Sequence, residues 1–367
     1  MRSISVTPLA VALALAGAAG EAALADQGMR VSGPVVHNNL AIYFVHGAST
    51  GGAVPLTLQE AVAKGQVQVS ETGRVNELEI ENTGSEAVFI QAGDIVKGGR
   101  QDRVLTVSFL LPANSGRLPI ASYCVEQGRW SARGSEDQKR FSSAGDAMPS
   151  RSALLAMAAP PPAPKEPSQT EAGLNPSSGN AALSQRVARE VDEVANKQRQ
   201  VWDSVASTQR KLSQGLNAPV ASPQSASSLQ LALENEKLKG AQAGFMAALQ
   251  PAGETEADVV GYVVAINGRM SSANLYPSNG LFRKMWGKQL AAAVTEAIGE
   301  AGGAAASATP PAPAAATQFL ADAEKGKSYQ RPVAAGTLQE IRDADKFLYN
   351  EARAADGQWI HRNYLAK

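Results

Sequence analysis

The sequence predicts an α+β protein with a mostly antiparallel, sandwich-like β core, a helical insertion in its middle and Pro/Ala-rich linkers. Short apolar alternations separated by Gly and Asn turns fill residues 30–142. Apolar residues then recur at helical spacing over residues 183–250, and strand patterns return after residue 257. Because strands precede and follow the helices instead of alternating with them, an antiparallel sheet is favoured over a parallel one.

The β-rich segment, residues 30–142, begins with the apolar run Leu40–Val45, which reads as a strand closed by glycines. A short helix is predicted over residues 57–63, because Thr57 can act as N-cap and Glu60 follows three positions later. The remaining alternations predict strands over residues 66–70, 76–81, 87–92, 103–112 and 118–125. Their near-regular spacing is typical of a sandwich or a barrel-like sheet.

The middle of the chain loses its periodicity between residues 143 and 182, where a Pro-rich run predicts a disordered linker. Two helices are expected within residues 183–250, at 183–214 and 228–249, and the short break between them suggests an αα-hairpin. Residues 257–300 should form a hairpin turning at Asn267-Gly268, followed by a helix over 281–298. Together these parts make up a core domain over residues 30–300.

A second low-complexity linker is predicted at residues 301–316, which are rich in Ala, Gly and Pro. Three strands are expected in the tail, residues 317–367, near 337–344, 347–354 and 358–365, with a turn at Asp356-Gly357. We expect these strands to pack on the core domain.

The first 25 residues have the pattern of a secretory signal peptide. Arg2 provides a positive start, an apolar run extends from Pro8 to Gly20, and Ala23-Leu24-Ala25 fits a cleavage site. The run is short for a membrane span, and no later segment is long and apolar enough for one. The expected location is therefore periplasmic or secreted, after cleavage near Ala25.

Composition excludes several classes of function. Lys plus Arg and Asp plus Glu both number 34, so no net charge draws the protein to nucleic acid. Cys124 is the single cysteine and cannot form an intrachain disulfide; we interpret it as a buried apolar residue rather than a nucleophile. The three histidines are far apart in sequence, so neither a metal centre nor another cofactor is expected.

The polar residues that suggest chemistry lie on one predicted hairpin, Gln91–Leu105. Gly98-Gly99 can adopt positive φ and turn consecutive backbone N–H groups toward an anion, which Arg100 and Arg103 could clamp. The Lys and Ser/Thr of a nucleotide-binding loop are absent here, so that motif is rejected. The alternative is a structural hairpin in which Asp94 and Arg103 form a salt bridge.

A second polar cluster ends the next predicted strand, at Cys124–Trp130. Glu126 and Arg129 flank a turn and could pair, and Trp130 offers a flat surface for a sugar or a base. If the two hairpins are neighbours, they form one rim. The expected ligand-binding residues are then Asp94, Gly98, Gly99, Gln101, Arg103, Glu126, Arg129 and Trp130.

These residues also carry a family resemblance. The hairpin matches a G-D/E-x-x-x-G-G-x-Q-x-R pattern at Gly93–Arg103, and the strand end matches C-V-E-x-G-R-W at Cys124–Trp130. With the later pattern at Gly261–Gly268 and the residues Phe282–Trp286, the chain resembles the bacterial ARG and Rhodanese-Phosphatase-superfamily-associated protein family. The family's association with ADP-ribosylglycohydrolases and rhodanese-phosphatases implies ADP-ribose-like or phosphorylated ligands. A secretory signal would instead place this chain away from cytoplasmic NAD metabolism.

Three functions are compatible with the sequence. The first is a non-catalytic binding module for a small anionic, sugar-like or nucleotide-like ligand. The second is a hydrolase of a glycosidic or phosphoester bond, with Asp94 and Glu126 as the acid–base pair. The third is a structural protein whose helices dock a partner in the cell envelope.

Overall fold

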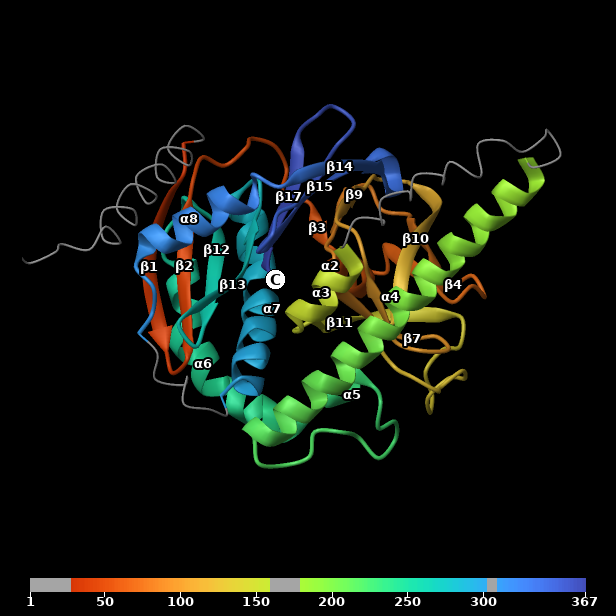
Figure 1. Ribbon diagram of the computed structural model, residues 1–367, viewed down its shortest axis with the longest axis horizontal. Coiled ribbons are helices and arrows are strands. Elements are labelled where there is room, and N and C mark those ends of the chain that lie inside the picture. The colour runs from red at the N-terminus through yellow and green to blue at the C-terminus, as the bar shows by residue number, and fades with distance from the viewer. Residues whose placement is uncertain (1–27, 159–178, 302–308) are drawn as a thin grey trace, which may run out of the picture.

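The computed structural model describes residues 28–158, 179–301 and 309–367, and it confirms the α+β class. It contains an eight-stranded antiparallel sheet and a closed six-stranded barrel, which lie side by side with helices between and around them (Figure 1). The predicted signal peptide lies outside the described residues. Within the described part of the chain, every helix is too short or too polar to cross a membrane.

The large sheet is built from both ends of the chain, in the order β1-β2-β12-β13-β17-β16-β15-β14. Its strands are β1 (Arg30–His37), β2 (Leu40–His46), β12 (Val259–Ile266), β13 (Arg269–Leu275), β14 (Lys327–Pro332), β15 (Leu338–Asp343), β16 (Phe347–Arg353) and β17 (Trp359–Ala366). The predicted turn at Asn267-Gly268 is confirmed: both residues have positive φ, at 50° and 72°, and they join β12 to β13. The three predicted tail strands correspond to β15, β16 and β17.

Helices cover both faces of this sheet, which explains why β2 is apolar along its whole length. Leu40, Ile42 and Phe44 pack toward α6 (Glu236–Glu254) and α7 (Asn279–Gly299). The alternate residues Tyr43 and Val45 pack on the other side with α8 (Pro313–Ala323). Successive side chains of a strand point to opposite faces, so a strand buried on both faces needs no polar alternation.

The barrel is closed in the order β10-β5-β4-β11-β7-β8. Its strands are β4 (Val67–Glu71), β5 (Glu77–Asn82), β7 (Asp94–Gly98), β8 (Arg103–Leu105), β10 (Gly116–Cys124) and β11 (Arg140–Ala147). Val69, Leu78 and Ile80 are fully buried in its apolar core, whereas their neighbours in sequence are polar. A small sheet of β3 (Leu56–Thr57), β6 (Val88–Ile90) and β9 (Phe109–Leu111) adjoins it.

Two helices form as the sequence predicts. In α2 (Leu58–Ala63) the Thr57 hydroxyl accepts from the Glu60 N–H at 3.2 Å, and the Thr57 N–H donates to the Glu60 carboxylate at 2.8 Å. This confirms the capping box. The second helix, α7, contacts both β11 of the barrel and β12 of the large sheet and so joins the two bodies. Its predicted apolar stripe is buried, at Phe282, Met285, Trp286, Leu290 and Val294.

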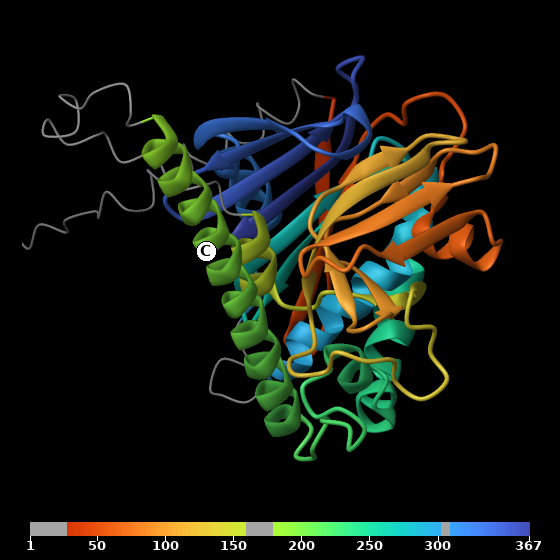
Figure 2. The same cartoon turned by 90° about the vertical axis from the view of Figure 1, so that its right-hand side faces the viewer.

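The helical middle differs from the prediction. The long helix α4 (Gly179–Gly215) packs on α3 (Arg151–Ala158), α7 and β10, whereas α6 packs mainly on α7. The predicted αα-hairpin is therefore wrong, because both helices pack on α7 and on other elements instead of on each other. A short helix, α5 (Leu229–Leu233), lies between them. Figure 2 shows α4 (green) as a long helix whose N-terminal end extends beyond the molecular body.

Both linkers are shorter than the sequence predicts. Residues 143–147 belong to β11, paired with β7, and residues 151–158 form α3, which buries Ala153 and Met157. Residues 159–178 of that linker lie outside the described part of the chain. Pro313 begins α8, so the second linker ends before residue 316. The strand predicted at 103–112 is two strands, β8 in the barrel and β9 in the small sheet.

Candidate functional site

The β7–β8 hairpin turns through two glycines in the left-handed region, Gly98 with φ 118° and Gly99 with φ 56°. The Gly98 N–H donates to Asp102 Oδ1 at 3.0 Å, and the Gly99 N–H donates to the carbonyl of Asp137 at 3.1 Å. The next N–H, that of Arg100, donates to Glu71 Oε1 at 3.0 Å. The backbone groups expected to bind an external anion are therefore occupied by oxygens of the protein itself.

Arg103 is fully buried in the barrel wall, with acceptors beside its Nη1 and Nη2 atoms, whereas its Nε has no hydrogen-bond partner in the described chain. Its Nη1 lies 2.7 Å from Cys124 Sγ and 3.2 Å from Gln101 Oε1, and its Nη2 lies 3.5 Å from Glu71 Oε1. The predicted alternative, a salt bridge between Asp94 and Arg103, is wrong. Glu71 is the partner; it lies 32 positions earlier on β4, where the sequence gives no sign of the pairing.

Asp102 and Glu126 form the other half of this cluster, and both are fully buried. Glu126 Oε2 lies 2.7 Å from Arg129 Nε, so the predicted pairing of these two residues is confirmed. Asp102 accepts from Arg133 at 3.1 Å and from the Ser228 hydroxyl at 3.1 Å. Burial raises the pKa of Asp102, and the Gly98 N–H and Arg133 oppose that rise.

We call Glu71, Asp102, Arg103, Glu126, Arg129 and Arg133 the hairpin ion network. Within this set three carboxylates face three guanidinium groups, and Arg133 also pairs with the partly exposed Glu136 at 2.8 Å, so each guanidinium has a carboxylate partner without a ligand. Burial also raises the pKa of the adjacent Cys124 thiol to about 11, which keeps it protonated at neutral pH and unsuited to nucleophilic attack. The ion pairs and hydrogen bonds of the network connect β8 to β10 and to the segment that follows β10.

Asp94 lies apart from the other expected site residues. Its carboxylate accepts from the Gln91 N–H at 3.0 Å and pairs with Lys288 of α7 at 2.5 Å. Three residues of β7 lie between Asp94 and Gly98, which are about 13 Å apart along the strand. Glu126 lies beyond the Gly98 end of β7, where it accepts from the Asp102 N–H. This separation gives no support to Asp94 and Glu126 as one acid–base pair.

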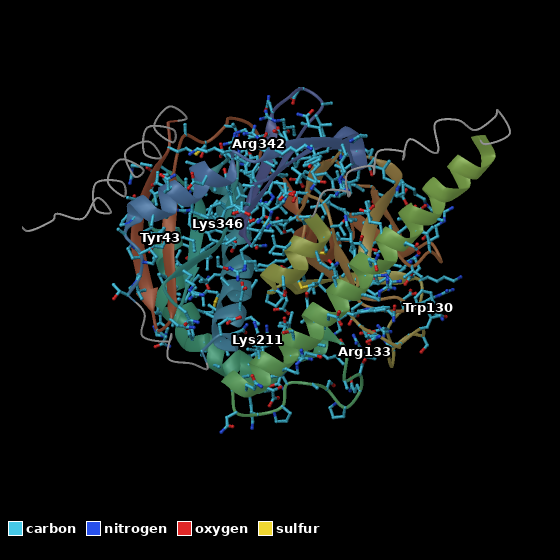
Figure 3. All side chains as sticks on the ribbon, viewed as in Figure 1. Tyr43, Trp130, Arg133, Lys211, Arg342 and Lys346 are labelled. Carbon is cyan, nitrogen blue, oxygen red and sulfur yellow. The ribbon has the colours of Figure 1, made fainter. Side chains whose placement is uncertain are left out.

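Trp130 is the one expected site residue with a largely open side chain, at 44% exposure. The guanidinium carbons of Arg100 and Arg103 lie 5.5 and 5.7 Å from its ring centre, within cation–π range. Figure 3 shows Trp130 at the outer margin of the barrel and Arg133 nearer to α4. Trp130 thus covers the hairpin ion network on its solvent side.

A cleft of about 490 Å³ lies behind this network, between β10, α4 and the segment that follows β14. We call it the β10–α4 cleft. Its size is within the range of small-molecule sites, which are typically apolar with a few polar groups. The apolar lining includes Val107, Tyr123, Met157, Val194 and Val333. The polar lining consists of the neutral residues Asn76, Thr106 and Ser122, the carboxylates Glu77 and Glu193, and the cations Lys197 and Arg331.

Arg331 is the most informative residue of this cleft. Its Nε donates to Gln339 Oε1 at 2.8 Å, and no carboxylate lies within 4 Å of its guanidinium among the described residues. Burial lowers the pKa of Arg331, and Tyr123 and Glu193 oppose that change. Two further lining residues have a buried oxygen without a hydrogen-bond partner in the described chain, Asn76 Oδ1 and Ser122 Oγ.

Sequence reasoning missed Arg331 because β14 was not predicted. Its signal was the short alternation Lys327–Pro332, which ends in a proline as edge strands often do.

One cluster in the described chain has the spacing of a metal site: His46, Glu256 and Asp258. Arg30 already lies 3.1 Å from Asp258 and 3.6 Å from Glu256. A cation at this position would have to displace that guanidinium, so we assign no metal here.

The fold defines a class: an α+β protein in which a buried ion network on a closed barrel supports the wall of a cleft. The chain belongs to the family of the ARG and Rhodanese-Phosphatase-superfamily-associated Protein domain (ARPP-1), whose family model matches residues 28–365. This confirms the resemblance carried by the hairpin and by Cys124–Trp130. No curated protein and no solved structure matches the chain.

Proposed function

We propose that the protein is a non-catalytic binding module for a small anionic ligand, held in the β10–α4 cleft by Arg331. The observation that carries this proposal is the partly buried Arg331 guanidinium, which forms no ion pair within 4 Å among the described residues, although Glu193 lines the same cleft and interacts with it at longer range. Taking a cation out of water is unfavourable unless an anion and hydrogen bonds compensate it. A phosphate or carboxylate group in the cleft would supply both.

The rest of the cleft suits a ligand with an anionic group on a sugar or nucleotide-like body. Lys197 adds a second cation, which shares its charge with Glu193 at 3.3 Å. The Tyr123 ring offers an apolar wall against which a flat ring can pack, and Asn76 and Ser122 offer polar atoms for hydroxyl groups.

The hairpin ion network then has a positioning role. It fixes Cys124, the neighbour of Tyr123, through the Arg103–Sγ contact. The Gln198 side chain of α4 completes this arrangement, because its amide accepts from the Cys124 N–H and donates to the Cys124 carbonyl, both at 2.9 Å. The two walls of the cleft, β10 and α4, are thereby joined at one residue, which is the support a preorganised site needs.

A second role, as an interaction protein, is favoured by one observation. Val191 and Val194 of α4 are 62% and 39% exposed, although the valine stripe of this helix was expected to pack. If this surface binds a partner or a second copy, the variant Val191→Glu, which leaves the cleft-lining Val194 unchanged, should lower the molar mass measured by light scattering after size exclusion. An unchanged mass would argue that the stripe has no partner under those conditions.

We also propose that the protein is exported, on the pattern of residues 1–25 described above. Expression of the full sequence should give a periplasmic or secreted product whose intact mass corresponds to cleavage near Ala25. An uncleaved product in the cytoplasm would contradict export.

The ligand proposal is tested by a thermal-shift screen of inorganic phosphate, sugar acids, sugar phosphates, nucleotides and ADP-ribose. At least one of these anions should raise the melting temperature of the wild-type protein, and the rise should disappear in Arg331→Gln. Arg117→Gln, which removes a 67% exposed arginine at the other end of β10, is the matched control and should keep the rise. A flat screen, or an equal rise in Arg331→Gln, would reject the proposed site.

A further inference from the structure

A chain of three polar side chains crosses one edge of the large sheet, far from the β10–α4 cleft. Ser32 of β1, His46 of β2 and Asp258, next to the start of β12, come from three adjacent strands. Ser32 Oγ lies 2.6 Å from His46 Nε2, and His46 Nδ1 lies 2.8 Å from Asp258 Oδ1. Figure 1 shows β1 and β2 at the opposite side of the molecule from β10.

The register of the sheet brings these residues together. Arg30 pairs with His46 and Ser32 with Phe44 on β1 and β2, so Ser32 and His46 are diagonal neighbours on one face. On the other side, His46 pairs with Val259 of β12, and Asp258 precedes Val259. The imidazole therefore lies between a hydroxyl and a carboxylate, and it is almost completely buried.

Each partner fixes one ring nitrogen of His46. Asp258 accepts only, so Nδ1 carries the proton, and Nε2 is then left to accept the Ser32 hydroxyl proton. Arg30 lies 3.1 Å from the second oxygen of Asp258. The hydrogen bond from His46 lowers the pKa of Asp258, and the charge of Arg30 adds to that effect, so the carboxylate is ionised at neutral pH.

Ser32 is accessible where the ladder is interrupted. It is partly exposed on β1, an edge strand of the described sheet. The register shifts between Ser32 and Val35, and Gly33 in that shift has φ 104°, a conformation that glycine tolerates best. Shifts of this kind at a sheet edge redirect the neighbouring side chain and end the pairing, and they recur beside active sites.

We infer that Ser32 is a nucleophilic serine, activated by His46 and oriented through Asp258, that accepts acyl groups from carboxylic esters. The order of atoms, from hydroxyl to Nε2 and from Nδ1 to carboxylate, is the one that general-base activation of serine requires. This site is independent of the anion-binding cleft, because no residue is shared between them.

The reaction balances within these groups and the substrate. Ser32 Oγ forms a bond to the ester carbonyl carbon while its proton moves to His46 Nε2. The carbon–alkoxide bond then breaks, and the leaving alcohol takes the proton from Nε2. The product is acyl-Ser32, which water hydrolyses by the reverse proton path to release the carboxylic acid.

The test is covalent labelling of the full-length folded protein with a fluorophosphonate, followed by peptide mass spectrometry. The phosphonate forms a bond to a nucleophilic serine and releases fluoride, so it reports the nucleophile without knowledge of the natural ester. We expect one label per chain, on the peptide that contains Ser32, and none on heat-unfolded protein. A burst of p-nitrophenol from p-nitrophenyl acetate, equal to the labelled fraction, should accompany it.

Three variants test whether Ser32 is labelled because His46 and Asp258 activate it or only because it is exposed. Ser32→Ala should abolish the label. Asp258→Asn should slow it by about 100-fold or more, because His46 loses the carboxylate that holds it in the tautomer needed for a general base. Ser142→Ala, which removes an exposed serine of β11, should label like the wild type. Asp258 is about half exposed, so its variant should remain folded, which circular dichroism checks.

Absence of label on the folded wild type would overturn the inference. So would a label on another residue, or equal rates in the wild type and Asp258→Asn, because each would leave Ser32, His46 and Asp258 as a purely structural link between strands.

Discussion

The charge of Arg103 is balanced inside the barrel wall by Glu71, and no side of this guanidinium is open to solvent. A buried arginine of this kind serves stability as long as its partners remain, because removal of one partner leaves an uncompensated charge. Arg331 is in a different situation, since its guanidinium has a hydrogen-bond acceptor in Gln339 but no carboxylate within 4 Å in the described chain; Glu193 lies farther away in the same cleft. The two arginines therefore predict different consequences when they are replaced.

Replacement of Arg103 by methionine should destabilise the protein by about 3–5 kcal/mol, because Glu71 would be left as a buried carboxylate without its cation. Urea unfolding followed by circular dichroism measures this change. Arg117→Met is the control, because that side chain is 67% exposed, and exposed ion pairs contribute less than about 1 kcal/mol. If Arg103→Met instead has the same free energy of unfolding as the wild type and binds the ligand more weakly, Arg103 would belong to the ligand site.

At the scale of single elements, the β7–β8 turn depends on its second glycine. A Cβ added at Gly99 would overlap the ring of Phe141 and approach Glu71 Oε1 to 2.8 Å, in addition to the strain of φ 56°. Gly128 also has positive φ, 88°, but a Cβ there meets no atom within 4 Å. Substitution of Gly99 therefore adds steric overlap to backbone strain, whereas substitution of Gly128 adds backbone strain alone.

Gly99→Ala should therefore lower the free energy of unfolding by about 3 kcal/mol or more, the sum of overpacking and backbone terms. Gly128→Ala should lower it by only about 1–2 kcal/mol. Both values come from the same urea titration. Equal losses in the two variants would mean that the turn relaxes away from Phe141 and that packing against this ring is not what requires glycine.

Elements with strong local signals were predictable from the sequence, and elements set by distant partners were not. The capping box at Thr57 and the turn at Asn267-Gly268 are encoded within a few residues, and both form as expected. By contrast, β8 and β9 lie in one segment that reads as a single strand in the sequence, and only the closure of the barrel assigns them to different sheets. The αα-hairpin failed for the same reason, since α7 supplies the surface on which α6 packs.

The candidate site shows this limit more strongly. The pairing of Glu126 with Arg129 spans three residues and was predictable, whereas Glu71 lies 32 positions from Arg103. Arg331 lies more than 200 positions from Tyr123, on the other side of the cleft. A single sequence does not show which residues so far apart come into contact. It therefore indicates β10 as one wall of the cleft but does not indicate Arg331 as its cation.

At the scale of the whole molecule, helix α7 joins the sheet and the barrel, and Glu296 lies where it meets α3 and α4. Burial raises the pKa of Glu296 to about 7, although Arg151 partly opposes the rise. A carboxyl group whose folded pKa is higher than its unfolded value contributes stability at low pH and loses it as the pH rises through the folded pKa.

The free energy of unfolding should therefore fall by about 2 kcal/mol between pH 5 and pH 8 from this group alone. Glu296→Gln should remove that part of the decline, as urea unfolding at several pH values will show. Glu300→Gln, one turn further along α7 and more exposed, should retain it. An identical pH profile in Glu296→Gln and the wild type would contradict the assignment.

The central claim is that the β10–α4 cleft binds an anionic ligand through Arg331, and that the buried hairpin ion network holds the wall of this cleft in place. Isothermal titration calorimetry with the anion that gives the largest thermal shift tests it most directly, on the wild type, Arg331→Gln and Arg117→Gln. We predict one site per chain, an affinity about 10- to 100-fold weaker in Arg331→Gln because a charged hydrogen bond is lost, and no change in Arg117→Gln. Equal affinity in the wild type and Arg331→Gln, or no binding by the wild type, would contradict the account.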